Sequence, residues 1–243
     1  MTAAAHVVQW GRTPIPFAIR RSGRKKTVSI AVEPGGDVVV TAPKATGVER
    51  LHRLVREKAR WIVQHRRLTE DLEPAPAREF ISGETFLYRG RQHRLVVTSH
   101  AGAPEVKLEH GRFVVRLPRS ARAAARPVLV NAAMVSWYRR HAERMLPAQV
   151  AACARSLGLS SVPVQIVAQQ KRWASCTSAG CVRMNWRLVQ APPRLVEYVV
   201  MHELTHLRIP SHGEAFWRAL GRALPGYEMR RDELRRLGPR LTW

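Results

Sequence analysis

Two histidines and a glutamate in the last quarter of the chain have the spacing of a metal site. They stand in the pentapeptide His202-Glu203-Leu204-Thr205-His206. Residues four apart in a helix share one face and lie about 6 Å from each other, so both imidazoles could bind one tetrahedral Zn²⁺. Glu203 would lie beside them and could take a proton from water at the metal. Residues 199–201 are apolar, which predicts a buried helix whose polar groups serve a purpose.

A zinc site of this kind needs a third protein ligand and one open position. His212 follows six residues after His206, the spacing of metzincins, although Ile209 stands where those proteins have a glycine in the turn. Glu214 is the rival ligand, because some zinc enzymes use a carboxylate there. Ser211 and Glu214 also have the spacing of a capping box, which gives Glu214 a local task and favours His212.

Three functions are compatible with such a site. The first is a zinc-dependent peptidase, in which Glu203 is the general base for water that attacks a peptide carbonyl. The second is hydrolysis of a nucleotide or another phosphate ester by the same activated water, with nearby arginines attracting the phosphate. The third is a nucleic-acid-associated module with a structural zinc, which would have no use for Glu203. The arginines close to the motif are Arg172, Arg187 and Arg208.

The composition bounds the partners and the compartment. The 243 residues include 41 Lys and Arg against 18 Asp and Glu, a net charge of +23 that both halves of the chain share. We therefore expect nonspecific attraction to nucleic acid. No apolar run is long enough to cross a bilayer and the first residues lack a signal-peptide pattern, so the expectation is a cytoplasmic protein without membrane contact. The odd set Cys153, Cys176 and Cys181 indicates reduced thiols rather than a zinc cluster.

The chain up to about residue 120 has the pattern of a strand-rich region with one helix. A hairpin is predicted from strands at 27–32 and 38–40 around a turn at 34–37. A helix follows, with a capping box at Thr46 and Glu49 and apolar residues at helical spacing, ending near Glu73. Further strands are expected at 86–88, 95–97, 106–108 and 113–117, with a turn at His110-Gly111.

Beyond residue 125 the apolar period becomes helical. A long helix is expected from Arg126 to Leu157, where Gly158 ends it and Pro147 either kinks or restarts it. Short strands at 162–168 and 181–188 precede a helix that opens at Pro193 and continues to about Arg208. The segment 181–188 is a candidate for an exposed sheet edge that would bind an extended peptide. The sequence contains no repeats.

Four blocks of sequence around the histidines closely resemble the YgjP-like family of metal-dependent hydrolases. The blocks are Arg172-Trp173-Ala174-Ser175-Cys176, Met184-Asn185-Trp186-Arg187-Leu188, the helix segment 197–207, and Ser211-His212 with Phe216-Trp217. The N-terminal region is similar too, at Gly83-Glu84, Phe86, Tyr88 and Gly90-Arg91. Ala174 replaces the family's glycine in the first block, which puts in doubt any role that needs a positive φ there.

The resemblance implies a zincin-like metallopeptidase related to SprT-like and Wss-like proteases. We therefore expect an α+β fold, with a strand-rich N-terminal lobe (residues 1–120) packed on a zincin-like lobe (121–243) that carries the H-E-x-x-H helix. The expected metal ligands are His202, His206 and His212, with Zn²⁺ as cofactor and a protein or peptide as substrate. The candidate substrate-binding residues are Arg172, Trp173, Asn185 and Tyr227.

Overall fold

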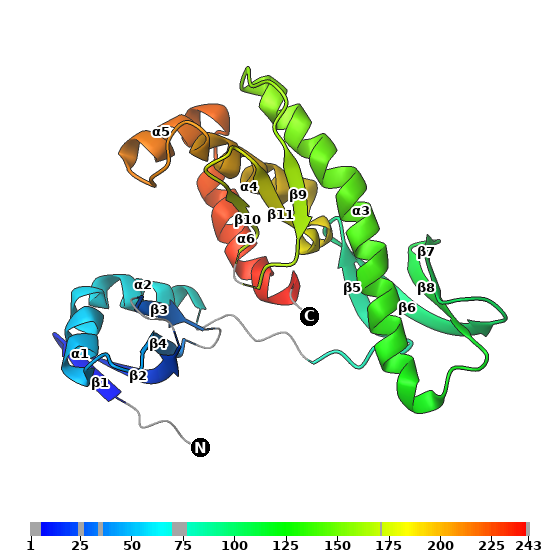
Figure 1. The fold of residues 1–243 in the computed structure, drawn as a ribbon, viewed down its shortest axis with the longest axis horizontal. Helices are drawn as coiled ribbons and strands as arrows, with labels where there is room; N and C mark the ends of the chain where they lie inside the picture. Colours follow the sequence, from blue (N-terminus) through cyan, green and yellow to red (C-terminus); the bar gives the residue numbers. More distant parts are fainter. Residues whose placement is uncertain (1–5, 24–26, 34–35, 70–76, 171, 242–243) are drawn as a thin grey trace. The chain divides into compact units, whose positions relative to one another are not determined.

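The computed structural model describes residues 6–23, 27–33, 36–69, 77–170 and 172–241. The chain divides into two compact units, Met1–Pro76 and Ala77–Trp243 (Figure 1). Each unit has its own hydrophobic core. Helices and strands are mixed in both, so the expected α+β class is confirmed. None of the helices in the described residues combines the length and apolar character needed to cross a membrane.

The first unit is a four-stranded sheet followed by two helices. The hairpin predicted from strands at 27–32 and 38–40 is confirmed by antiparallel pairing between residues 29–32 and 38–41, although residues 34–35 of its turn lie outside the described residues. Two earlier strands were missed by the sequence analysis, and the one expected helix is two helices that break at Lys58. The expected helix end near Glu73 lies outside the described residues. The elements are β1 (His6–Trp10), β2 (Thr13–Ser22), β3 (Ser29–Val32), β4 (Val38–Pro43), α1 (Val48–Glu57) and α2 (Ala59–Thr69).

The second unit begins with another four-stranded sheet and one long helix. The strands are β5 (Thr85–Tyr88), β6 (Arg91–His100), β7 (Glu105–Glu109) and β8 (Arg112–Pro118), followed by a short 3₁₀ helix, η1 (Ala123–Ala125), and α3 (Arg126–Ser156). The predicted turn at His110-Gly111 is confirmed by the antiparallel pairing of β7 with β8. Helix α3 runs without a break through Pro147, and Gly158 follows its end with a φ of +64°, as expected.

The rest of the second unit is a small sheet and three helices. Its elements are β9 (Val164–Val167), β10 (Ala174–Cys176), β11 (Val182–Asn185), the 3₁₀ helix η2 (Trp186–Gln190), α4 (Pro193–His206), α5 (Glu214–Ala223) and α6 (Tyr227–Leu241). Proline opens α4 as predicted. Helix α4 contacts α3, α5, α6 and β10, and Figure 1 shows it lying among them.

The two four-stranded sheets have the same topology, which the sequence did not reveal. Their orders are β1-β2-β4-β3 and β5-β6-β8-β7. In each sheet two antiparallel hairpins join through a parallel central pair, β2 with β4 and β6 with β8. A helix follows each sheet in the chain. The two sheets share their strand pairing and their connections but not their side chains. The similarity therefore cannot be recognised from the residue pattern alone.

The compact units divide after Pro76, whereas the sequence analysis expected a boundary near residue 120. The reason is that β5–β8 share one hydrophobic core with α3 and α4. Phe113 and Leu117 from the sheet, Tyr138 from α3 and Leu195 from α4 all belong to this cluster. The alternating apolar patterns of the strands before and after residue 76 are alike, so the sequence does not predict which hydrophobic core each sheet joins.

The hairpin β5–β6 is fixed to the segment that leads into α4. Its turn residues Arg89 and Gly90 have φ values of +51° and +80°, and their amides donate to the carbonyls of Val189 and Gln190 at 2.8 Å. A Cβ on Gly90 would lie 2.6 Å from Cγ and 3.1 Å from Cα of Pro192. Position 90 therefore requires glycine for two reasons: its φ is positive, and Pro192, the N-cap residue of α4, lies too close to leave room for a side chain.

This contact predicts that Gly90→Ala destabilises the protein more than Gly111→Ala. Gly111 is a matched control, because it has a φ of +74° in the corresponding turn of β7–β8 but no neighbouring atom within 4 Å of the place that a Cβ would take. The control should lose about 1 kcal/mol for the left-handed conformation alone. Gly90→Ala should lose a further 1 to 3 kcal/mol, roughly the cost of overpacking. Urea unfolding of both variants measures the difference in the free energy of unfolding. Equal losses would show that Pro192 moves aside at no cost.

Candidate metal centre

Helix α4 positions two of the candidate ligands. Nine of its 14 residues are buried, among them Val200 and Leu204, so its orientation is set by packing on several sides. His202 and His206 lie one turn apart, and their ring centroids are 4.9 Å from each other. Glu203, between them in sequence, is only 7% exposed. A buried helix thus presents two imidazoles and a carboxyl group at the wall of a cavity.

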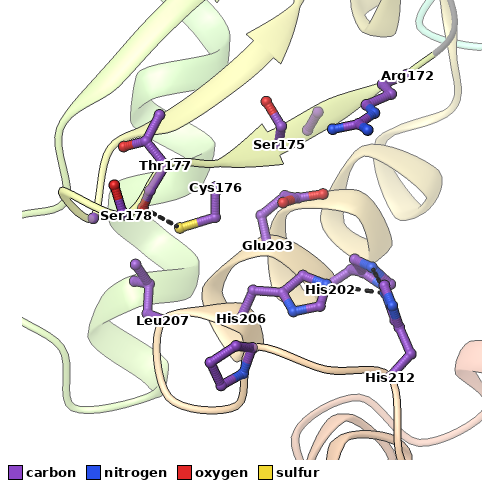
Figure 2. Close-up of a pocket in the computed structure, with 13 residues that line it drawn as sticks. Arg172, Ser175, Cys176, Thr177, Ser178, His202, Glu203, His206, Leu207 and His212 are labelled. Atoms are coloured by element: carbon purple, nitrogen blue, oxygen red, sulfur yellow. Dashed lines mark hydrogen bonds between the residues drawn. The ribbon is translucent and has the colours of Figure 1, made fainter. Parts of the chain in front are cut away.

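His212 completes a cluster of three imidazoles. Its Nε2 atom lies 2.9 Å from Nε2 of His202 and 3.0 Å from Nε2 of His206. Among the described residues, these three form the one group of at least three His, Cys, Asp or Glu side chains that could hold a metal ion. Figure 2 shows the rings turned toward one another, with Glu203 between the rings and strand β10.

The donor set fits a zinc ion. Two nitrogens at about 2.0 Å from a tetrahedral zinc would lie about 3.3 Å apart, close to the separations here. The Ile209 carbonyl accepts a hydrogen bond from Nδ1 of His206 at 3.1 Å, which leaves the lone pair of that ring on Nε2. Burial and the neighbouring imidazoles of His206 and His212 lower the pKa of His202 to about 4. The neutral form, which binds metal, is therefore favoured.

The turn from α4 to His212 is made without glycine. The amide of Ile209 donates to the Thr205 carbonyl at 3.0 Å, which closes one more helical turn after α4 ends. Pro210 then stops the helix, because it has no amide proton to continue it. No residue between 207 and 213 has a positive φ, so the glycine of metzincins has no counterpart here.

Glu214 points away from the histidines. Its side chain is 87% exposed and forms an ion pair with Arg218 one turn further along α5. The predicted capping box is wrong, because the N-cap of α5 is Gly213 and no side chain caps the helix. The same holds for Thr46 and Glu49, since α1 begins at Val48 after Gly47. Both N-cap glycines have extended backbone, and each helix begins later than the side-chain pattern indicated.

Burial and hydrogen bonding set the electrostatics of Glu203. Burial raises the pKa of Glu203 to about 7, while a hydrogen bond from the backbone N–H of Cys176 and the positive charge of Arg172 oppose the rise. A carboxyl group with a pKa near neutrality suits proton transfer at physiological pH. Glu203 lies between strand β10 and the histidine rings (Figure 2).

A cavity of about 770 Å³, here called the histidine cavity, lies between β10 and α4. The three histidines and Glu203 line one side, and the other side is formed by β10 and the turn after it, from Ala174 to Gly180. Strand β10 is at the edge of its sheet, because the order is β10-β11-β9. The expected edge at 181–188 is wrong: Val182–Asn185 pairs on both sides and is central. The short strand β10 had no alternating pattern by which to predict it.

A second cavity of about 380 Å³, here called the α6 cavity, adjoins the same residues. It shares Arg172, Ala174, His202 and Glu203 with the histidine cavity. Its remaining lining is Trp173, Tyr198, Val199, Arg231, Leu234 and Arg235. The expected substrate-binding residues Arg172 and Trp173 therefore both border a cavity. Tyr198 was missed, although its position four residues before His202 would have placed both on one helical face.

The other two predicted substrate residues lie elsewhere. Asn185 is buried, and its amide donates to the carbonyls of Gln169 and Arg172 at 2.7 and 3.1 Å. It lines neither cavity and instead holds the loop that leads to β10. Tyr227 also lines neither cavity and stacks on Trp217, with ring centroids 5.5 Å apart.

The structure also shows the conformation of Ala174 and the positions of the arginines near the motif. Ala174 is in extended conformation within β10, so alanine in place of the family's glycine causes no backbone strain. Of the three arginines expected to attract phosphate, only Arg172 lines the site. The Arg187 guanidinium stacks on Trp186 at 4.4 Å, and that of Arg208 donates to the Leu157 carbonyl at 3.3 Å.

A family model and several solved structures are similar to this chain. Two solved structures are similar: the metallopeptidase zymogens of Pyrococcus abyssi abylysin and Methanocaldococcus jannaschii jannalysin, at 22% and 25% identity and TM-scores of 0.35 and 0.33. Each match covers 37% of this chain and 91% or 92% of the other. No curated protein matches. The family model described as "YgjP-like, metallopeptidase domain" matches residues 26–237. The chain therefore belongs to the YgjP-like metallopeptidase family.

Proposed function

We propose that this protein is a zinc-dependent peptidase whose active site is the histidine cavity. The family is one of metallopeptidases, which are hydrolases that use a divalent metal ion and act on proteins or peptides. The observation that carries the assignment to this site is the convergence of three Nε2 atoms within hydrogen-bond distance, beside a buried carboxyl group. His202, His206 and His212 are the proposed ligands.

The proposed mechanism gives each residue one task. His202, His206 and His212 would hold a zinc ion, whose positive charge would make water more acidic and polarise the peptide carbonyl. Glu203 accepts the proton that the attacking water loses and later donates it to the nitrogen of the leaving amine. The backbone of β10 holds Glu203 through the Cys176 amide, and its free edge offers hydrogen-bonding groups to an extended peptide.

Hydrolysis of phosphate esters is less well supported. Such chemistry needs several cationic groups that converge on the metal, but of the three expected arginines only Arg172 lines the histidine cavity, and Arg187 and Arg208 are held elsewhere. Binding of nucleic acid, expected from the net charge of +23, has no support in the comparisons and stays a prediction.

His212→Ala should lose metal, whereas Glu214→Ala should keep it. Removing His212 leaves two protein ligands, too few for tight zinc binding at neutral pH. Glu214 is bound only to Arg218 at the surface, so its loss should not affect the site. Zinc content per chain after dialysis is the measurement. Full zinc occupancy in His212→Ala together with loss of zinc in Glu214→Ala would show that Glu214, and not His212, is the third ligand.

Glu203→Gln should keep both zinc and the fold but lose activity by at least about 100-fold, the usual scale for a general base. The amide has nearly the same shape as the carboxylate and cannot accept the proton. The measurement is cleavage of an unfolded protein by equal amounts of zinc-loaded wild type and variant. A parallel assay measures phosphate release from nucleoside triphosphates. Release that depends on Glu203, without any proteolysis, would indicate a phosphohydrolase instead of a peptidase.

A further inference from the structure

The α6 cavity shares Arg172 and Ala174 with the histidine cavity, so the two adjoin at the start of strand β10. The residues Arg172, Trp173 and Ala174 line it at the start of the strand. The histidine cavity instead continues along the end of the strand, from Ser175 through Cys176 to the turn that follows. Figure 2 shows Arg172 and Cys176 at opposite ends of β10, with Glu203 beneath the strand between them.

The direction of β10 indicates which part of a bound peptide would enter the α6 cavity. An extended peptide that adds to this edge in the antiparallel sense, the more stable pairing, runs against the direction from Ala174 to Cys176. Its N-terminal part then lies beside Cys176 and its C-terminal part beside Trp173. Bond cleavage occurs near Glu203, so the residue that follows the scissile bond lies next to the α6 cavity.

The walls of the α6 cavity are largely apolar, and its three arginines outnumber its one carboxyl group, that of Glu203. Val199 and Leu234 are 4% and 5% exposed, and Trp173 is half-buried. The guanidinium groups come from Arg172 and from two residues one turn apart on α6, Arg231 and Arg235.

The two arginines of α6 share a single carboxylate. Asp232 Oδ1 lies 3.4 Å from Nε of Arg231 and 3.5 Å from a terminal nitrogen of Arg235. The two guanidinium groups carry ten N–H donors between them, more than one carboxylate can accept. Both also influence the same side chain in the cavity: burial raises the pKa of Tyr198 to about 12, and the charges of Arg231 and Arg235 oppose that rise. Positive charge with spare donors therefore faces this cavity.

We propose that the α6 cavity binds the side chain of the substrate residue that follows the scissile bond and selects an acidic one, Asp or Glu. The proposal rests on the peptidase function proposed above. The methylene groups of a glutamate would pack on Trp173, Val199 and Leu234, while its carboxylate would accept charge-assisted hydrogen bonds from Arg231 and Arg235. A lysine would be repelled, and an apolar residue would cover the guanidinium groups while supplying no acceptor for the N–H donors that Asp232 leaves over.

The first experiment compares four quenched fluorescent peptides that differ only in the residue after the scissile bond, namely Glu, Gln, Leu or Lys. The zinc-loaded full chain should cleave the Glu peptide with a kcat/KM at least about tenfold above the Gln peptide, with Lys the slowest. Glu203→Gln is the blank. Equal rates for Glu and Gln, or a preference for Leu or Lys, would overturn the acidic selectivity while leaving the peptidase function intact.

Arg235→Gln and Arg231→Gln identify the source of the selectivity. Each should reduce the Glu-to-Gln ratio by about threefold or more, and the double variant should abolish it. The ratio is measured within one protein sample, so it does not depend on the folded fraction. Arg236→Gln is the matched control, because Arg236 is exposed on the same helix and lines a different cavity. A ratio that survives the double variant, or that falls as much in the control, would refute the assignment.

A binding measurement separates this inference from the proposed function. Calorimetry with zinc-loaded Glu203→Gln protein and the uncleaved Glu and Gln peptides needs no turnover. Tighter binding of the Glu peptide, lost in the Arg231 and Arg235 double variant, supports the acid-binding cavity even if no peptide is cleaved. Equal binding of the two peptides refutes it. Absence of Glu203-dependent cleavage in all four peptides would count against the peptidase function alone.

Discussion

Burial of helix α4 is the constraint on which the candidate site depends. The helix packs against α3, α5, α6 and β10, so it can neither rotate nor slide without opening the core. Its polar residues would be costly in such a position unless they were used. Three of them line the histidine cavity, namely His202, Glu203 and His206. The same packing that stabilises the helix therefore aims its functional groups.

Strand β10 is the second element that organises the site. It is three residues long, and its inner edge pairs with β11. Its outer edge borders the histidine cavity, its amide at Cys176 donates to Glu203, and its first residue lies between the two cavities. The buried amide of Asn185 holds the loop before it. One short strand thereby borders the carboxyl group of Glu203, the histidine cavity and the α6 cavity.

The sheet β5–β8 supports this arrangement from within the same core. Gly90 at its first hairpin packs on Pro192, the residue before α4, and Tyr138 of α3 donates to the Leu87 carbonyl at 2.7 Å. The second unit therefore has one hydrophobic core, in which a sheet without candidate site residues contacts the segment that leads into α4. The first unit uses the same strand topology with a separate core. Shared topology did not lead to a shared role, because only the second sheet contributes to the core that contains α4.

The amino-acid sequence alone determined the features that depend on local geometry. The spacing of His202 and His206 predicts a shared face because a helix repeats every 3.6 residues, and Pro193 and Gly158 mark helix ends through their own backbone preferences. The resemblance of four short blocks indicated the family. The tertiary structure decided everything that depends on which segments meet. It made β10 the sheet edge, formed the α6 cavity and joined β5–β8 to the core of α4. These contacts join residues far apart in the chain, and neither periodicity nor spacing carries information about such pairs.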